Sequence, residues 1–200
     1  IIRYLDESHL LCWQLAPLVQ NGLGRNDGVV FYVVVIDAGN GQFKNLRSIA
    51  QVLTGLKHMG FDEVFEVACA AELVSAYARK YINRTDIKKP VISSACPAIT
   101  RIISMNYPYL CENIMPILPP VDIAAMLARE KVMQEHPELQ NEDIGIIFIS
   151  PCPAKVSYVK NNFAGERNYV SATISVRDAY FALLDVMKRG DTEPLETTEA

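Results

Sequence analysis

The sequence predicts an α/β fold, with an open, mainly parallel sheet that carries helices on both faces. Short apolar runs alternate with helical patterns almost throughout the 200 residues, and this order favours parallel strands joined by crossover helices. The most apolar run, residues 29–36, is rich in β-branched residues and is typical of a central strand. Hydrophobic residues make up 50% of the chain, which is enough for one sizeable core.

The expected elements follow from the spacing of apolar residues and from the glycines and prolines between them. We expect strands at 8–15, 29–36, 63–68, 90–94, 144–150 and 169–175. Apolar residues recur at helical spacing at 46–58, 70–82, between Cys96 and Pro108, at 121–136 and at 176–188. We expect residues 1–190 to form one lobe, and residues 191–200, which have no periodicity, to be a polar linker or a frayed terminus.

Charge and hydropathy exclude some classes of function. The net charge of -4 gives no long-range attraction to phosphate backbones, so nucleic acid is not an expected partner. No apolar run reaches the roughly 18 to 20 residues that span a bilayer, and the start of the chain lacks the layout of a signal peptide. We therefore expect a soluble, cytoplasmic protein without a membrane partner. Because the chain begins at Ile1 and not at Met, we also expect it to be part of a longer protein.

The five cysteines are odd in number and widely scattered, which favours reduced thiols over a disulfide scaffold. No Cys-x-x-Cys pair is present and the three histidines stand far apart, so a self-contained zinc site is not predicted. Cys12, Cys69 and Cys111 have apolar neighbours and are predicted to be core residues. His58 falls at the predicted end of a helix, where a histidine is favourable without any catalytic role.

The other two cysteines occupy similar positions. Cys96 precedes Pro97, and Cys152 lies between Pro151 and Pro153; each follows an expected strand that ends in serine. In parallel α/β folds, ligands bind at the carboxyl ends of the strands, where loops carry the chemistry and the sheet holds them in place. These two thiols are therefore the best indication of function.

A second candidate site follows the predicted central strand. Gly39-Asn40-Gly41 lies between this strand and a predicted helix, where such a turn can hold a pyrophosphate at the helix N-terminus. The third glycine of that pattern is missing. A tight turn between strand and helix is therefore the favoured interpretation.

The stretches around the two cysteines resemble a known family. Ser-Ala-Cys-Pro-Ala at 94–98 and Ser-Pro-Cys-Pro-Ala-Lys at 150–155 resemble the H-cluster domain of the iron-only (di-iron) hydrogenase large subunit. Further likeness is found in Gly60-Phe-Asp-Glu-Val-Phe65, Ala71-Glu72-Leu73, Tyr107-Pro-Tyr-Leu110, Pro119-Pro120, Ala124-Ala125 and, more faintly, Leu15-Ala16-Pro17. The resemblance covers about residues 46 to 188, and residues 20–45 match poorly. It implies that the lobe is the first of two that enclose the cofactor.

The resemblance also implies roles for single residues. In the family, the second of two adjacent cysteines ligates a four-iron four-sulfur cluster and the first passes protons to the di-iron unit; these positions are Cys96 and Ala95. The other loop supplies a second cluster ligand, Cys152, and a lysine that hydrogen-bonds a cyanide of the di-iron unit, Lys155. The residues expected to line the cofactor are Ala16, Pro17, Ala95, Pro97, Pro151 and Lys155.

Some positions depart from the family pattern. Ala95 cannot carry a proton, and the family's methionine before Pro-Cys is Ser150 here. The position of its proton-relay glutamate is taken by Tyr158, whose pKa near 10 in an unperturbed phenol suits a relay poorly. The pattern resembles the sensory branch of the family, in which hydrogenase-like domains are joined to signalling modules. We therefore expect the chain to sense hydrogen or redox state, with at most slow turnover; whether it is an enzyme stays open.

The resemblance places the cofactor in the intact parent protein. The family's other two cluster cysteines, a Cys-x-x-x-Cys pair, lie in the second lobe and beyond residue 200. The cluster and its di-iron unit, together called the H-cluster, are thus expected in the parent, and the site in this fragment is expected to be empty. The expected partners are the second lobe and either a fused signalling module or a redox partner.

An alternative function belongs to a different class. A non-metal α/β binding or interaction module, with a nucleotide at Gly39-Asn40-Gly41 and purely structural cysteines, also agrees with the predicted fold. Fold alone does not distinguish these functions. The metal-binding hypothesis requires the sulfurs of Cys96 and Cys152 to face one cavity.

Overall fold

The structure is a computed structural model of the chain, and it describes residues 31–36, 49–160 and 169–188. Its centre is a parallel sheet with the strand order β2-β1-β3-β4. The strands are β1 (Phe31–Ile36), β2 (Glu63–Glu66), β3 (Ile144–Ser150) and β4 (Ala172–Ser175). The predicted fold class, an open parallel sheet with helices, is confirmed.

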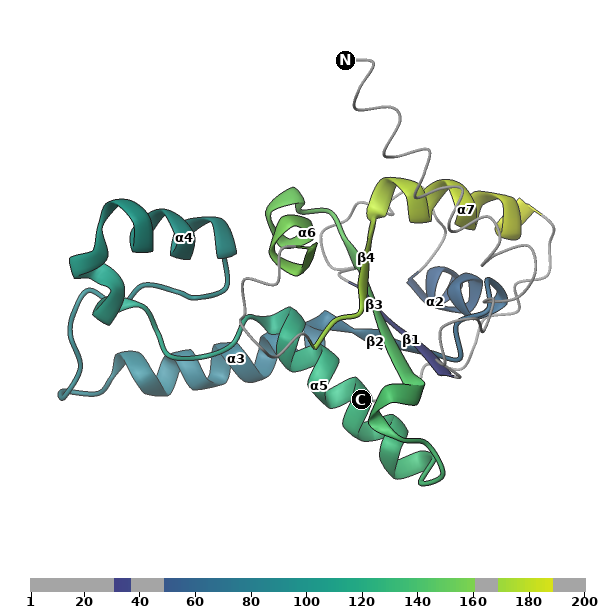
Figure 1. Cartoon of the computed structure of the whole chain (residues 1–200), viewed down its shortest axis with the longest axis horizontal. Coiled ribbons are helices and arrows are strands. Elements are labelled where there is room, and N and C mark those ends of the chain that lie inside the picture. The colour runs from purple at the N-terminus through teal and green to yellow at the C-terminus, as the bar shows by residue number, and fades with distance from the viewer. Residues whose placement is uncertain (1–30, 37–48, 161–168, 189–200) are drawn as a thin grey trace, which may run out of the picture.

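Helices cover both faces of the sheet, as predicted. They are α2 (Ile49–His58), α3 (Val67–Ile82), α4 (Pro97–Asn106), α5 (Pro120–Glu135), α6 (Pro153–Lys160) and α7 (Val176–Lys188), with 3-10 segments η1 (Pro108–Asn113) and η2 (Asn141–Asp143). Figure 1 shows α2 and α7 together on one side of the sheet and α3 and α5 on the other. Within the described residues, no helix combines the length and the apolar character that crossing a bilayer requires.

The core has two layers, one on each face of the sheet. Along β1, Val33 and Val35 pack into the layer with α3 and α5, while Val34 and Ile36 pack into the layer with α2 and α7. The side chains of β3 are buried along the whole strand. Two buried faces explain why β1 and β3 are continuous apolar runs without the alternation of a half-exposed strand.

The strand register brings the carboxyl ends of the strands to one edge of the sheet. Ile36 is paired with Glu66 on one side and with Ile149 on the other, and Ser150 is paired with Ser175. The chain therefore leaves β3 toward Cys152 at the edge where parallel α/β folds bind their ligands.

Gly60 ends α2, as predicted, because the turn there needs a left-handed residue. Its φ is 101°, a value that residues with a Cβ adopt at a cost of about 1–2 kcal/mol. The Gly60 N–H donates to the Lys57 carbonyl at 2.9 Å, and the Phe61 N–H reaches back to the Leu56 carbonyl at 3.4 Å. These bonds satisfy carbonyls at the end of α2 and turn the chain into β2.

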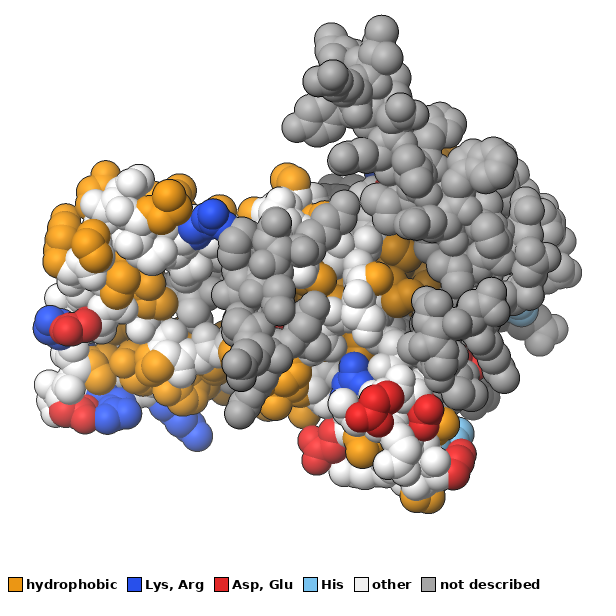
Figure 2. Space-filling model, viewed as in Figure 1, with side chains coloured by type: hydrophobic (Ala, Val, Ile, Leu, Met, Phe, Trp, Pro, Cys, Tyr) orange, Lys and Arg blue, Asp and Glu red, His pale blue; other side chains and the backbone are white. Residues whose placement is uncertain are grey.

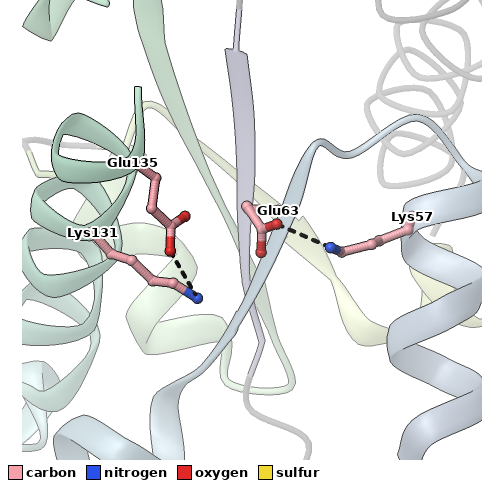
Figure 3. Close-up of polar contacts among 4 residues, drawn as sticks. All are labelled: Lys57, Glu63, Lys131 and Glu135. Atoms are coloured by element: carbon pink, nitrogen blue, oxygen red, sulfur yellow. Dashed lines mark hydrogen bonds and ion pairs between the residues drawn. The ribbon is translucent and has the colours of Figure 1, made fainter. Parts of the chain in front are cut away.

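Charged side chains lie near the opposite, amino end of the sheet (Figure 3). Lys57 on α2 pairs with Glu63 at the start of β2 at 3.0 Å, and Lys131 pairs with Glu135 on α5 at 3.9 Å. Figure 3 shows the two pairs on either side of the sheet. Partly exposed pairs of this kind contribute about 1 kcal/mol or less each. A charged residue on β2 also suits an edge strand, because it discourages pairing with other chains.

Residues 75–118 form an extension away from the sheet, which we call the arm; it contains the second half of α3, α4 and η1 (Figure 1). The buried residues of α3, Val67, Ala70 and Val74, all lie in its first half, against the core. Within the arm, Ile103 and Met115 are buried. The arm thus has a small apolar centre of its own.

The strand predicted at 90–94 is wrong. The structure has a single bridge there, Ile92 with Ile114, in which the Ile92 N–H donates to the Asn113 carbonyl and the Met115 N–H to the Ile92 carbonyl, each at 2.8 Å. The run lies in the arm, away from the sheet, and it has no second neighbour to extend the ladder. Pro90 also lacks the N–H that a paired strand requires.

Other differences in the predicted elements are smaller. Helix α3 begins at Val67, directly after β2, whereas the prediction extended the strand to residue 68. Strand β4 begins at Ala172 instead of 169. The predicted strand at 8–15, the turn at Gly39-Asn40-Gly41 and the tail at 191–200 lie outside the described residues.

Candidate functional site

Cys152 lies in a tight turn at the carboxyl edge of the sheet, between β3 and α6. Its N–H donates to the Oγ of Ser150 at 3.2 Å, and Ser150 is itself buried at the end of β3. The N–H groups of Lys155 and Val156 both donate to the Cys152 carbonyl at 3.1 Å. These bonds fix the backbone on both sides of Cys152, and its side chain remains partly exposed.

Cys96 lies at the start of α4, in the arm, and its thiol is exposed. Its carbonyl accepts from the Thr100 N–H at 3.1 Å. The preceding loop is held by the Ser94 hydroxyl, which donates to the Ile117 carbonyl at 2.7 Å. The prediction that both thiols follow strands of the sheet is therefore correct for Cys152 and wrong for Cys96.

The two cysteines nevertheless share one local structure. Each immediately precedes a helix whose first residue is proline, Pro97 in α4 and Pro153 in α6. Proline suits this position because its fixed φ is helical and the N–H that it lacks has no helical partner there. The N-terminus of a helix also favours a negatively charged group. Both thiols are thus placed where a thiolate bound to a metal is electrostatically favoured.

The helices α4 and α6 are neighbours, and a cavity of about 540 Å³ lies between them. Pro97, next to Cys96, is at its wall, and Tyr158 contributes from α6. The remaining lining residues are Thr100, Arg101, Ser104, Met105 and Ile114. The residues from α4 recur at helical spacing, so one face of that helix forms most of the wall.

Behind the cavity, the hydroxyl of Tyr158 donates a hydrogen bond of 2.8 Å to Oδ2 of Asp122 on α5. Asp122 is only 3% exposed, and burial raises the pKa of its carboxyl above the usual range, although the bond from Tyr158 opposes that shift. Burial and then the hydrogen bond and charge of Asp122 raise the pKa of the Tyr158 hydroxyl well above its usual value. The phenol therefore keeps its proton and acts as a donor.

Asp122 is not among the site residues predicted from the sequence, where it falls in the first turn of the helix expected at 121–136 and suits that position as an acidic residue. A stronger signal was its position among Val121, Ala124 and Ala125, which are all fully buried. A carboxylate in such an apolar stretch needs a partner, because burying an unpaired charge is costly. The sequence alone does not identify that partner, which lies 36 residues further along the chain.

The predicted site residues fall into two turns. Pro151, Cys152 and Lys155 lie in the turn into α6, and Ala95, Cys96 and Pro97 lie in the turn into α4. Lys155 is partly buried in the first turn of α6. Ala16 and Pro17 lie outside the described residues. The role of each of these residues in holding a cofactor stays a prediction.

The thiols supply half of a possible ligand set. In the part of the chain that the structure describes, no cluster of three or more His, Cys, Asp or Glu side chains could hold a metal ion. A four-iron four-sulfur cluster is ordinarily held by four thiolates. Cys96 and Cys152 fit two of these positions by their chemistry and by their placement at the starts of neighbouring helices, but neither is among the residues that line the cavity between those helices.

The structure also tests the predictions for the other cysteines and for His58. Cys111 is exposed on η1, so the prediction that it is a core residue is wrong. Cys69 is partly buried on α3, and Cys12 lies outside the described residues. His58 is exposed in the last turn of α2, as predicted.

Solved structures share this fold at low sequence identity. The FeFe-hydrogenase HydA(deltaEFG), from work on stepwise H-cluster assembly, is 18% identical with a TM-score of 0.68, covering 94% of this chain and 50% of that chain. An apo FeFe-hydrogenase HydA1 variant from Chlamydomonas reinhardtii is 17% identical with a TM-score of 0.65, covering 94% of this chain and 51% of that one. The chain thus spans about half the length of these structures. At such identities, the likeness shows the fold.

The sequence also matches a family model. Residues 31–192 match the model described as "Iron only hydrogenase large subunit, C-terminal domain". This match includes all four strands, both cysteine turns and the cavity between α4 and α6. The chain therefore belongs to the family of the C-terminal domain of iron-only hydrogenase large subunits.

Proposed function

We propose that the chain is one lobe of an iron-sulfur, H-cluster-type domain that senses hydrogen or redox state in its intact parent protein. The observation that carries the proposal is the placement of Cys96 and Cys152. In a member of this family, each precedes the first turn of a helix, and the two helices are neighbours around a cavity. This arrangement supports a shared ligand better than two unrelated structural thiols.

In this proposal, Cys96 and Cys152 provide two of the four thiolates of a four-iron four-sulfur cluster, and a second lobe provides the others. Lys155 lies in the first turn of α6 and would donate a hydrogen bond to the di-iron unit. When bound, the cofactor supplies the reversible conversion of hydrogen to protons and electrons. The residues of this chain hold and orient it.

Two positions support sensing over fast turnover. Ala95, beside Cys96, has no group that can carry a proton. Tyr158 lines the cavity, but its hydroxyl is bound to Asp122 and its pKa is raised, chiefly by burial. A phenol with a raised pKa is a poor general base, because such a base works best with a pKa near the operating pH. We therefore expect slow proton transfer at this site.

The exposed apolar surface of the arm supports a second lobe as partner. Figure 2 shows hydrophobic side chains gathered over the region of α3 and α4. The most exposed on the arm are Tyr109 at 71% and Met105 at 68%, together with Ile82, Ile99, Ile102 and Tyr107, and Leu73 lies next to the arm on α3. Soluble monomers rarely expose contiguous apolar patches of large area. We propose that a further lobe of the parent, of the kind its relatives contain, covers this surface, and that a signalling module or redox partner is attached to the same protein.

Anaerobic reconstitution of the full-length protein with iron and sulfide tests the proposed cofactor. We expect cluster signals in absorption and electron paramagnetic resonance spectra that are lost or strongly reduced in Cys96→Ala and in Cys152→Ala. Cys111→Ala removes an exposed thiol of the same arm outside the two turns and should keep the signals. Signals that survive both single substitutions at full intensity would refute the proposal and favour the alternative, a non-metal module.

A gain-of-function variant tests the proposed sensing role. Hydrogen oxidation by the reconstituted protein should be slow, whereas the cluster should change its redox state when hydrogen replaces argon. Ala95→Cys restores a thiol at the position next to Cys96 and should raise turnover, while Ala98→Cys, in the first turn of α4, should not. Fast turnover in the unmodified protein would contradict the sensing role and leave the cofactor proposal intact.

Comparison of two lengths of chain tests the partner surface. Amide hydrogen exchange along α4 should be slower in the full-length protein than in residues 1–200 alone, because the second lobe would cover that helix. Exchange in β3, which is buried in both, should be unchanged. Equal exchange of α4 in the two proteins would show that nothing in the parent covers the arm.

A further inference from the structure

The charge of Asp122 is unusual for its place in the fold. Its neighbours on α5, Val121, Ala124 and Ala125, are fully buried in the core, and Asp122 is 3% exposed. Transferring a carboxylate into such surroundings is unfavourable unless it is hydrogen-bonded. The first turn of α5 offers a favourable helix N-terminus, but an uncharged residue would serve the packing of α5 as well. The bond from Tyr158 gives the carboxylate a specific use.

Helix α6 needs such a contact because it is short and lightly buried. It has eight residues, and Val159 is the buried hydrophobic residue among those described along it. Few residues of α5 and α6 approach each other, and the hydrogen bond between Tyr158 and Asp122 joins side chains of these two helices. The ring of Tyr158 packs against the core on one side and lines the cavity on the other. Its hydroxyl can therefore limit rotation of α6 about its own axis.

The orientation of α6 determines the position of the predicted ligands. Cys152 immediately precedes the helix, and its carbonyl accepts hydrogen bonds from Lys155 and Val156 in the first turn. Lys155 and Tyr158 are three residues apart and thus lie on neighbouring parts of the helix surface. A rotation of α6 would move Cys152 and Lys155 together relative to Cys96 at the start of the neighbouring helix α4.

We propose that Asp122 is a positioning residue: through Tyr158 it fixes the orientation of α6 and so sets the position of Cys152 and Lys155 relative to α4, which begins next to Cys96. The identity of the cofactor that Cys96, Cys152 and Lys155 would hold rests on the proposed function. The role of Asp122 in fixing the orientation of α6 does not. Asp122 is buried behind Tyr158 and is not part of the cavity wall. Its effect is on the geometry of the ligands, which in cofactor sites is set by residues behind the ligands as much as by the ligands themselves.

Amide hydrogen exchange of the full-length protein tests the fixing of α6. Tyr158→Phe keeps the ring and removes the hydroxyl, and Asp122→Leu removes the acceptor. In both variants, exchange in residues 153–160 should be faster by about tenfold or more, the factor expected when local opening no longer breaks a hydrogen bond to a charged group. Asp122→Asn keeps an acceptor oxygen and should restore most of the protection. Tyr109→Phe makes the same chemical change on the arm, outside α6, and should leave exchange in residues 153–160 unchanged.

The spectrum of the reconstituted cluster tests the consequence for the ligands. Tyr158→Phe and Asp122→Leu should shift the paramagnetic resonance signal of the cluster, and Tyr109→Phe should not. Three results would overturn the inference. The first is unchanged exchange in residues 153–160, and the second is faster exchange spread over the whole fold. The third is an unshifted resonance signal although exchange shows that α6 is loosened. If neither the unmodified protein nor any variant takes up a cluster, the proposed function fails. The exchange experiment still decides in that case whether Asp122 fixes α6.

Discussion

The hydrogen bond between Tyr158 and Asp122 should make the stability of the fold depend on pH in a specific way. Tyr158→Phe leaves the ring in the core and removes the donor that the buried carboxylate uses. A hydrogen bond to a charged group contributes about 1.5–3 kcal/mol, and one between neutral groups about 0.5–1.5 kcal/mol. We therefore expect Tyr158→Phe to lower the free energy of unfolding by about 2 kcal/mol when Asp122 carries its charge.

The sign of the pH dependence follows from the pKa of Asp122. Burial raises this pKa above its ordinary value of 3.8, so the cost of burying the carboxylate is present at neutral pH and is relieved as the pH falls through the raised pKa. Tyr158→Phe removes the bond that favours the charged form, and the pKa should rise further. The cost of the substitution should thus fall to about 1 kcal/mol below pH 3.8, with a slope no steeper than about 1.4 kcal/mol per pH unit for one proton.

Urea unfolding followed by circular dichroism, at pH 7 and at pH 3.5, measures both values. Tyr109→Phe is the control, because Tyr109 is 71% exposed and should be neutral to within about 0.5 kcal/mol at both pH values. The reasoning would be refuted by a cost of Tyr158→Phe that is the same at both pH values, or that grows as the pH falls.

The remaining predictions concern the sheet and its surroundings. Ile149→Ala on β3 should lower the free energy of unfolding by about 2–5 kcal/mol, because Ile149 is fully buried, while Ile149→Val should cost about 1 kcal/mol; equal costs in urea unfolding would contradict this. Gly60→Ala should lower the free energy of unfolding by about 1–2 kcal/mol, because the turn needs a φ of 101° and the exposed side chain gains no packing that would offset the strain. Thermal unfolding measures this loss, and an unchanged stability would contradict the prediction. Glu63→Gln should lower the free energy of unfolding by about 1 kcal/mol or less, and this loss should shrink in 1 M salt because the ion pair with Lys57 is partly exposed. A loss that does not depend on salt would contradict this explanation.

The sheet was predictable where burial leaves a pattern in the sequence. The continuous apolar runs of β1 and β3 correctly indicated central strands, because both of their faces are covered. Most helices were likewise found from their spacing, and α7 begins and ends where predicted. These features depend on local composition, so a single sequence contains them.

The features that were not predictable depend on distant neighbours. Residues 90–94 look like a strand in composition, but a strand also needs partners on the sheet, and the arm carries this run away from it. Cys111 has apolar neighbours in the sequence and yet is exposed, because η1 lies at the surface of the arm. Asp122 looked like a helix-start residue, and its link to Tyr158 joins positions 36 apart in the sequence. In each case tertiary context overrides the local pattern.

The separation of the two thiols has a thermodynamic consequence. Cys152 follows a buried strand of the sheet, whereas Cys96 belongs to the arm, which has its own small apolar centre around Ile103 and Met115. A cluster bound by both would couple the arm to the sheet, because the free energy of binding then also stabilises their relative placement. Loss of the cluster, or a change in its bonding, would release the arm first. Under the proposed function, the arm is therefore the part of this chain whose placement would respond to the state of the cofactor.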